Sequence, residues 1–401
     1  MRRAFKVAVV GAGGIGSGAA YWASRVAGDD VLCLEQWAPG YGRGASEDHS
    51  RIIRLGYHAS KYTALTRDAY AAWEVLERES GVPLVHRTGM INLARSGTEG
   101  AAILDAYGVA MGEHGIDHER LDAAEVARRW PQFRLDDDCE GVFQPDGGIL
   151  DIRKGVAVQL ALARGHGATV LPHAEVTAID DTGDGIRLTT TAGPFEAERL
   201  IMCAGAWTVR LLESTLDIRW PIRLTQEQVT YFATTRLHDF APERFPIWIW
   251  HGDDDEEYYG FPVHGEVATK AAQDLGGPDV TLDPRSWEPD RERVERVARF
   301  VEELLPGYGG PELYTRCCLY DMPPDRDFVI DHLPGHPRIA VAIGAGHAAK
   351  FASLLGRILA DLTLDGTTAF PIEAFRADRP AMVDPDYVAG YRLGPAVAPA
   401  G

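Results

Sequence analysis

The sequence predicts an α/β protein in which a Rossmann-like nucleotide-binding domain is interleaved with an α+β domain built on a mainly antiparallel sheet. An apolar run at residues 7–10 leads into glycines at G-x-G-x-x-G spacing. Two further apolar runs, at residues 199–202 and 339–343, also break into turns of small residues. Because such strand–turn–helix units lie near both ends and in the middle of the chain, we expect the two domains to alternate along it.

The glycine turn after the first strand is suited to holding a dinucleotide pyrophosphate. Gly11 makes the tight turn, Gly13 lets the backbone approach the phosphates, and Gly16 lets the helix predicted at residues 17–25 pack on the strand. The N-terminus of this helix then faces the anion. An ordinary βαβ turn is the alternative interpretation. The cofactor-binding residues predicted from this turn are Gly11, Gly13, Gly14, Ile15 and Gly16.

A second strand and a second glycine-rich turn bear on the choice of dinucleotide. The strand predicted at residues 31–34 ends in Glu35, about 20 residues after the glycine turn, where an acid binds ribose hydroxyls. The strand at 339–343 breaks into a glycine-rich turn at 344–347, and a helix is predicted at 348–362. Its N-terminus places partial positive charge near the pyrimidine edge of a flavin, where reduction leaves negative charge. This second turn favours flavin over nicotinamide.

The other elements follow from hydrophobic periodicity and turn residues. Amphipathic helices are predicted at residues 63–80 and 151–165, strands at 222–234, 246–251 and 257–262, and a helix at 288–305 that ends at a Pro-Gly pair. The acidic run at 253–257 is interpreted as a solvated hairpin turn and not as a metal site, and residues 390–401 as a disordered tail. The nucleotide-binding domain then comprises residues 1–90, 150–220 and 320–401, and the substrate domain 91–149 and 221–319.

Composition and charge exclude several classes of function. The chain has 401 residues, of which 45% are hydrophobic, and a formal net charge of −19, which argues against a nucleic-acid or acidic-membrane partner. No secretory leader pattern precedes the first strand and no run is apolar enough to span a bilayer, so we expect a cytoplasmic protein, and a monomer. The five cysteines lack C-x-x-C spacing, which predicts free thiols rather than a disulfide framework or a zinc site.

Four motifs together point to a known family. They are R-I-I-R at residues 51–54, Y-G-F-P at 259–262 leading to Lys270, C-L-Y at 318–320 followed by D-F-V-I-D at 327–331, and G-H-A-A-K-F at 346–351. With these motifs the sequence resembles the monomeric sarcosine oxidase and N-methyltryptophan oxidase family, which are FAD-dependent amino acid oxidases of the D-amino acid oxidase superfamily. The resemblance covers nearly the whole chain. It implies a glutathione-reductase-type FAD-binding domain.

The resemblance also implies a role for each matching residue. Arg54 and Lys350 bind the substrate carboxylate, Lys270 activates oxygen, and Tyr259 and Tyr320 hydrogen-bond a carboxylate or a water. The flavin-contacting residues implied by the same motifs are Glu35, Ser46, Arg51, Cys318, Gly344, Gly346, His347 and Lys350, with the flavin covalently attached at Cys318 and with His347 not catalytic. On spacing alone, Arg51 and Arg54 are surface cations, Lys350 is an exposed helix residue and Cys318 is an inert buried thiol, and the resemblance reverses each of these interpretations.

The reaction implied by the resemblance is the oxidation of a secondary amino acid, either N-methylated or cyclic. A hydride passes to the flavin, an imine leaves, and O2 reoxidises the flavin to give H2O2. Asp274 stands where relatives have an active-site histidine, and the glycine-rich turn before His347 is one residue shorter than in well-known relatives. Sarcosine, a longer N-methyl amino acid and a cyclic imino acid all stay open as substrates. The alternatives in function are a dehydrogenase that uses another electron carrier, an NAD(P)-dependent enzyme and a non-catalytic flavin-binding protein.

Overall fold

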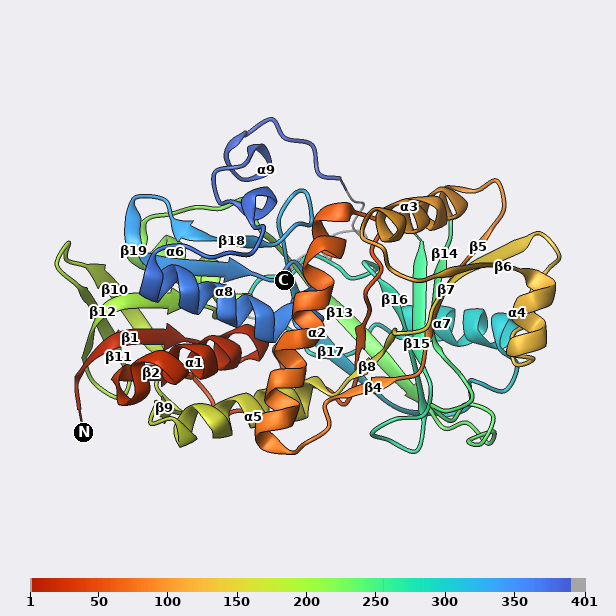
Figure 1. Ribbon diagram of the computed structural model, residues 1–401, viewed down its shortest axis with the longest axis horizontal. Helices are drawn as coiled ribbons and strands as arrows, with labels where there is room; N and C mark the ends of the chain where they lie inside the picture. Colours follow the sequence, from red (N-terminus) through yellow and green to blue (C-terminus); the bar gives the residue numbers. More distant parts are fainter. Residues whose placement is uncertain (1, 255, 284, 391–401) are drawn as a thin grey trace.

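The computed structural model describes residues 2–254, 256–283 and 285–390. Figure 1 shows two large sheets that lie side by side along the longest axis, with most of the helices at the end that carries the N-terminus. The first sheet contains β1 (Ala4–Val10), β2 (Val31–Leu34), β9 (Thr169–Leu171), β10 (Val176–Asp181), β11 (Ile186–Thr190), β12 (Phe195–Met202), β18 (Val329–Leu333) and β19 (His336–Ile343). The strands β9, β2, β1, β12 and β19 are parallel neighbours in that order, as a nucleotide-binding sheet requires.

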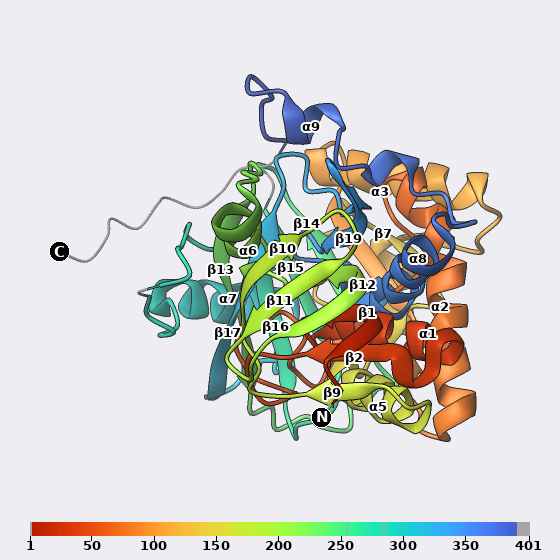
Figure 2. The ribbon, with the colours of Figure 1, turned by 90° about the vertical axis from the view of Figure 1, so that its left-hand side faces the viewer.

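The alternation of side chains along β1 separates two hydrophobic cores. Val7 and Val9 point toward one face of the sheet, and Ala8 and Val10 toward the other, because successive strand residues face opposite sides. The first face is covered by α1 (Gly14–Ala27), α2 (Ser60–Ser80), α5 (Ile152–Gly165) and α8 (Ala352–Asp365), and the second by β10, β11 and α6 (Trp207–Leu216). Figure 2 shows α1 and α8 on one side of this sheet and α6 on the other. The parallel strands are therefore buried on both faces.

The second sheet is antiparallel except at one pair of strands. Its order is β17 (Glu312–Met322), β13 (Arg223–Phe232), β16 (Thr269–Asp274), β15 (Glu257–Phe261), β14 (Ile247–His251), β5 (Met90–Arg95), β7 (Cys139–Gln144) and β6 (Glu119–Asp122), and only β14 and β5 run parallel among the described residues. A third, small sheet contains β3 (Arg51–Ile53), β8 (Gly148–Leu150) and β4 (Val85–Arg87). The predicted fold class, an α/β domain with a mainly antiparallel second sheet, is confirmed. The domain boundaries given above stay a prediction, and β17 carries residues 320–322 into the second sheet.

The remaining helices are short or lie at the edges. They are α3 (Glu99–Glu113), α4 (Ala123–Arg129), α7 (Arg291–Leu304) and α9 (Pro380–Val383), with 3₁₀ turns at Gly28–Asp30, Ala348–Phe351 and Glu373–Phe375. Helix α1 begins three residues earlier than expected, because the glycine turn itself forms its first turn. The helix expected from residue 348 starts as a 3₁₀ turn and becomes α-helical at Ala352. Within the described ranges, no helix is both long and apolar enough to cross a membrane.

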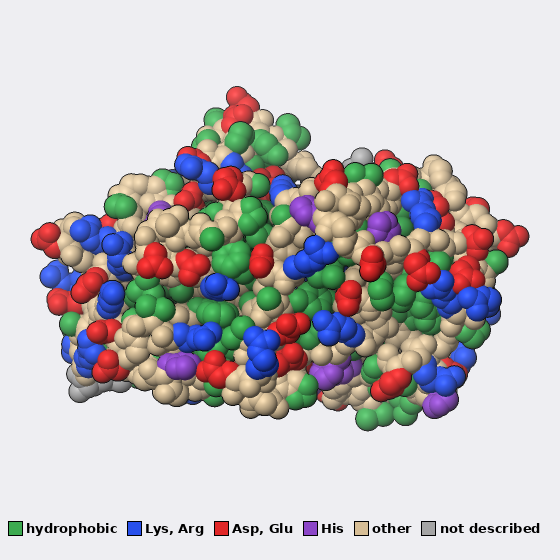
Figure 3. Space-filling model, viewed as in Figure 1, with side chains coloured by type: hydrophobic (Ala, Val, Ile, Leu, Met, Phe, Trp, Pro, Cys, Tyr) green, Lys and Arg blue, Asp and Glu red, His purple; other side chains and the backbone are tan. Residues whose placement is uncertain are grey.

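On the face drawn in Figure 3, acidic and basic side chains are interspersed and do not form patches of one sign. The tail expected at residues 390–401 lies outside the described residues apart from Gly390.

Candidate active site

A cavity of about 370 Å³ lies at the carboxyl ends of β1 and β2 and extends to β15, β16 and β17 of the second sheet. This edge of a parallel sheet is where such folds bind ligands. The sequence-predicted site residues that line it are Gly11, Gly13, Gly14, Ile15, Glu35, Ser46, Arg51, Arg54, Tyr259, Lys270, Cys318, Tyr320, Gly344, Gly346, His347 and Lys350. Of the predicted residues, only Gly16 does not line the cavity. Segments from all parts of the chain therefore converge on one site.

The glycine turn leaves no room for larger side chains. Gly11 has φ +95°, and a Cβ atom there would lie 2.5 Å from the carbonyl oxygen of Cys203. A Cβ atom on Gly16 would lie 1.9 Å from the carbonyl oxygen of Gly11, so Gly16 permits the close packing of helix on strand. The first turn of α1 contains no acidic residue, and its N-cap residue is Gly13, which has no side chain to cap it. The N-terminus of α1 is therefore available to an anion.

Two polar side chains shape the wall beside this turn. The Glu35 carboxylate accepts hydrogen bonds from the backbone N–H groups of Ala12, at 2.8 Å, and Trp37, at 3.0 Å. Ser46 Oγ accepts one from the N–H of Gly14 at 2.8 Å. Glu35 is thus held at the end of β2, at the place where a ribose-binding acid stands.

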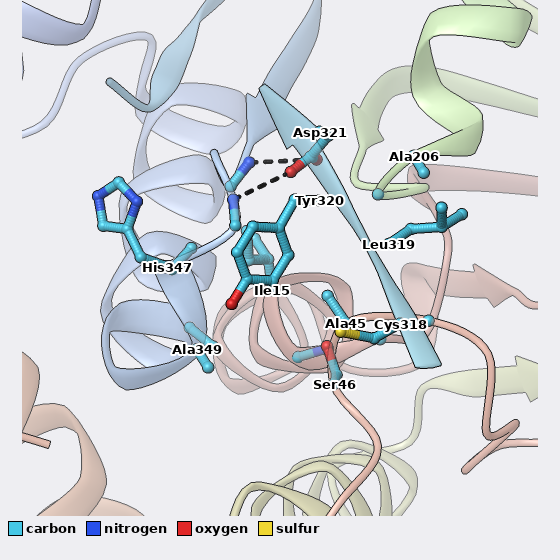
Figure 4. A pocket seen from close by; sticks show the side chains of 18 of the residues that line it. Ile15, Ala45, Ser46, Ala206, Cys318, Leu319, Tyr320, Asp321, His347 and Ala349 are labelled. Carbon is cyan, nitrogen blue, oxygen red and sulfur yellow. Dashed lines mark hydrogen bonds between the residues drawn. The ribbon is translucent and has the colours of Figure 1, made fainter. Parts of the chain in front are cut away.

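Strand β17 brings Cys318 and Tyr320 to the cavity. Cys318 lines it and Cys317 does not, as the alternation of side chains along a strand predicts. Figure 4 shows the Cys318 thiol beside Ala45 and Ser46. Burial raises the pKa of the Cys318 thiol to about 12, against the opposing effect of the Arg51 guanidinium.

Arg51 itself organises the loop that precedes β3. Its guanidinium donates to Asp48 Oδ2 at 2.9 Å and to the carbonyl oxygens of Ser50, Ala45 and Glu47 at 2.9 to 3.0 Å. The structure therefore places Arg51 at the cavity wall with its donors engaged by the loop.

Asp321 holds the second glycine-rich turn, and sequence reasoning missed it. Its two carboxylate oxygens each lie 3.4 Å from a backbone nitrogen, those of Gly344 and Gly346, which Figure 4 draws as dashed lines. Burial raises the pKa of Asp321 to about 6. A Cβ atom on Gly346, whose φ is +75°, would lie 2.3 Å from the Tyr320 ring, so only glycine fits there.

Arg54 and Lys350 converge on Tyr57. The Arg54 guanidinium carbon lies 4.2 Å from the Tyr57 ring centre, and Lys350 Nζ lies 5.2 Å from it and donates to the Tyr57 hydroxyl at 2.7 Å. Arg54 Nε and Nη1 are buried and have no hydrogen-bond partner among the described residues. Burial, followed by the nearby Arg54 charge, lowers the pKa of Lys350 well below its ordinary value. Unpaired buried donors of this kind favour an anionic ligand.

Lys270 is buried at the cavity wall, among polar groups of the loop that precedes β3. Nζ donates to Asp48 Oδ2 at 2.8 Å, to the Ser50 carbonyl oxygen at 2.8 Å and to Ser50 Oγ at 2.9 Å, and lies 4.2 Å from the Phe261 ring centre. Burial lowers the pKa of Lys270 to about 8, although Asp48 opposes the shift. Burial also disfavours the Asp48 carboxylate, but Lys270 and Arg51 outweigh this effect and lower the Asp48 pKa. Sequence reasoning missed Asp48, because this loop residue becomes a partner only after folding.

The remaining polar wall contains Asp274, Arg326 and Glu257. Asp274 and Arg326 form an ion pair, and Arg326 has a left-handed backbone with φ +57°. Glu257 lies directly opposite Asp274 across β15 and β16 and lines the cavity. Within the acidic run Asp253, Asp254 and Glu256 are exposed, whereas Glu257 begins the strand that was predicted at 257–262, so the interpretation of Glu257 as part of a solvated turn was wrong. A strand begins at Glu257 and directs its side chain inward.

Tyr259, Tyr320 and His347 complete the cavity wall. Neither tyrosine hydroxyl hydrogen-bonds to another residue in the part of the chain that the structure describes, and burial raises the pKa of both. His347 Nδ1 lies 2.8 Å from the Ala345 carbonyl oxygen, and its ring stacks on Phe328. Burial lowers the pKa of His347 well below its ordinary value, so the ring is neutral at neutral pH.

Residues 6–362 match the family described as FAD dependent oxidoreductase. The chain belongs to this family. The glycine cradle, the N-terminus of α1 and the carboxylate at the end of β2 fit the FAD that the family name specifies. A Cβ atom at Gly11 or Gly16 would fill that cradle.

Relatives of this FAD-dependent oxidoreductase include curated enzymes and solved structures. It is 32% identical over 384 residues to an N-methyl-L-tryptophan oxidase of Salmonella arizonae, an alignment that covers 94% of this chain and 99% of the relative. It is similar to the structure of NikD, an amino acid oxidase essential for nikkomycin biosynthesis, with a TM-score of 0.81, 27% identity and coverage of 93% and 97%. A glycine oxidase from Geobacillus kaustophilus shares the fold, with a TM-score of 0.78 at 20% identity and coverage of 94% and 99%.

Proposed function

We propose that the protein oxidises the carbon–nitrogen bond of a secondary amino acid, with FAD as the electron acceptor and O2 as the oxidant that regenerates it. The observation that carries this proposal is the pair of unpartnered, buried Arg54 nitrogens beside Lys350, in the same cavity as the FAD cradle. The similarity to N-methyl-L-tryptophan oxidases supports a secondary amine. Bound FAD supplies the two-electron acceptor, which protein side chains alone lack.

The chain's own residues bind and orient the substrate. Arg54 and Lys350 hold the carboxylate by charge-assisted hydrogen bonds, with Tyr57 between them. Because burial and Arg54 disfavour the protonated form of Lys350, the bound carboxylate restores its charge. Fixing the carboxylate at two points limits the positions of the amine and gains rate by orientation. The free hydroxyls of Tyr259 and Tyr320 face the same space.

The site for oxygen is assigned to Lys270. Its charge is held by Asp48 and Ser50 in a buried place at the cavity wall, where a cation stabilises negative charge that develops on oxygen. Two electrons passed to O2 with two protons give H2O2. The five cysteines are all free, which supports a reducing compartment such as the cytoplasm.

Anaerobic mixing with N-methyl and cyclic amino acids tests the function. We expect the visible absorbance of the flavin to bleach, and admission of air to restore it and release H2O2. A flavin that no amino acid bleaches would indicate a non-catalytic flavin-binding protein. Bleaching without release of peroxide in air would indicate a dehydrogenase with another electron carrier.

We further propose that the FAD is covalently attached at Cys318, because this thiol lines the cavity beside Ser46 and its neighbour Cys317 does not. Cys318→Ala should release the flavin into the supernatant when the protein is precipitated with acid, whereas the unaltered protein should retain it. Cys317→Ala is the matched control and should keep the flavin in the precipitate. Flavin that stays with the Cys318→Ala polypeptide would exclude this attachment site.

The pKa of Lys270 predicts a pH dependence for the reaction with oxygen. Burial lowers this pKa to about 8, so the amine is charged below that pH and loses its charge above it. The rate constant for reoxidation of the reduced enzyme should therefore be level at low pH and fall as pH rises through about 8. Stopped-flow mixing of the reduced enzyme with O2 across this pH range gives the profile. The same profile in Lys270→Met would show that another group titrates.

A further inference from the structure

Among the described residues that line the cavity, Glu257 is the one carboxylate that is held neither by an arginine or lysine nor by a backbone N–H group. Glu47 pairs with Arg316, Glu175 with Arg210, Asp274 with Arg326, Asp325 with Arg379 and Asp327 with Lys61, while Glu35 and Asp321 accept backbone N–H groups. Among the described residues, Glu257 has neither an arginine or lysine within 4.0 Å nor a backbone donor. Its one ionic contact is with His251 Nδ1, at 3.0 Å from Oε2. Acceptor positions on Glu257 therefore stay open.

The open positions face the cavity. Glu257 and Tyr259 are two residues apart on β15, so both side chains lie on the face that lines the cavity. The Glu257 side chain retains 30% exposure, while His251 behind it is almost fully buried and lies 3.1 Å from the Asn92 side chain. The strand side is thus closed by His251, and the carboxylate is accessible from the cavity.

Glu257 lies next to the place assigned to the substrate carboxylate. The Tyr107 ring lies near both Arg54 and His251, the ionic contact of Glu257: its centre is 5.4 Å from the Arg54 guanidinium carbon and 5.9 Å from the His251 ring. Burial disfavours the Glu257 carboxylate, but His251, Arg326 and Arg54 outweigh this effect and lower its pKa to about 2, so it is ionised at neutral pH. A substrate carboxylate on Arg54 and the existing pair of Arg326 with Asp274 leave the Glu257 carboxylate with His251 as its ionic contact and with no arginine or lysine of its own among the described residues.

We propose that Glu257 binds a positively charged nitrogen on the substrate side chain, so that the preferred substrate is a secondary amino acid with a basic side chain. This inference rests on the proposed function and deepens it. The α-carboxylate is held by Arg54 and Lys350, and an ammonium or guanidinium at the other end of the side chain donates to Glu257. A charge-assisted hydrogen bond of this kind changes binding by about 10- to 150-fold.

Three substrates and three forms of the enzyme test this inference. The substrates are Nα-methyl-L-lysine, its uncharged analogue Nα-methyl-L-norleucine, and N-methyl-L-tryptophan, whose side-chain N–H is neutral. We expect the unaltered enzyme to favour the lysine derivative over the norleucine derivative by about 10- to 150-fold in kcat/KM. Glu257→Gln, which keeps the shape and loses the charge, should remove this preference and leave oxidation of the norleucine derivative within a few-fold.

The matched control is Glu256→Gln, because the neighbouring Glu256 is exposed and bonds to the Tyr258 hydroxyl outside the cavity. It should leave all three kcat/KM values unchanged. Equal losses for the lysine and norleucine derivatives in Glu257→Gln, no preference in the unaltered enzyme, or a loss confined to the tryptophan derivative would each overturn the assignment. Failure of the unaltered enzyme to oxidise any of the three would instead count against the proposed function.

Discussion

Replacing Arg54 or Lys350 by methionine is expected to lower kcat/KM for the amino acid substrate by about 30- to 1,000-fold. Each change leaves a substrate carboxylate with a single cation in a site that is shielded from water, at a cost on the order of 2–4 kcal/mol in transition-state binding. Methionine keeps most of the volume of the side chain and removes its charge. Steady-state kinetics with O2 consumption as the readout gives the ratio.

Arg54 and Lys350 together form the carboxylate clamp, and its control is a substrate without the carboxylate. For an ester or a decarboxylated amine with the same side chain, kcat/KM should fall much less than for the acid, because these analogues have no carboxylate for the two cations to bind. Lys154→Met, which alters an exposed lysine paired with Asp151 on the surface of α5, should leave both substrates unaffected. An equal loss of kcat/KM for substrates with and without the carboxylate in the Arg54 or Lys350 variants would give these residues a structural role.

Lys270→Met is expected to slow reoxidation by O2 by about 100- to 1,000-fold, the usual effect of removing one electrostatic donor from a site of developing charge. Reduction of the flavin by substrate should change far less, because Lys270 Nζ donates to Asp48 and Ser50 and, among the described residues, not to Arg54 or Lys350 or their partner Tyr57. Stopped-flow absorbance separates the two half-reactions.

Lys270→Arg retains a charge and should recover part of the reoxidation rate. Loss of Lys270 also removes one cation from Asp48, which keeps Arg51, the Tyr231 hydroxyl and the His49 N–H as partners. The flavin spectrum and thermal unfolding of each variant must therefore first show that it is folded. If both half-reactions slowed equally in a folded Lys270→Met enzyme, the assignment of oxygen activation to Lys270 and of substrate binding to Arg54 and Lys350 would be wrong.

The local sequence was sufficient to predict those structural features that depend on backbone geometry or on hydrophobic periodicity. The glycine turn at residues 11–16 was predictable because a Cβ atom collides there with the neighbouring backbone. The strands at 31–34 and 339–343 were predictable because strands buried on both faces are continuously apolar. The helix that begins at Ile152 was located by its periodicity, and Asp151, which accepts from the N–H of Lys154, caps it.

The candidate site was predicted only in part. The motifs identified Arg54, Lys350 and Cys318, and the structure brings all three to one cavity. Tyr57 was missed because one tyrosine three residues after an arginine carries no distinguishing pattern. Glu257 was misjudged because an acidic run before a strand has the same composition whether its last member faces water or a cavity.

The sequence by itself determined which segments form the nucleotide cradle, because close packing of glycine against neighbouring backbone is a local requirement. Only the tertiary structure decided which charges meet. Lys270 pairs with Asp48 and Arg326 with Asp274, whereas Glu257 pairs with no lysine or arginine among the described residues. The spacing of the residues predicts none of these outcomes. The physical reason is that the pKa values and affinities in this site depend on burial and on neighbours at a few ångströms, which strands from distant parts of the chain supply only when they pack together.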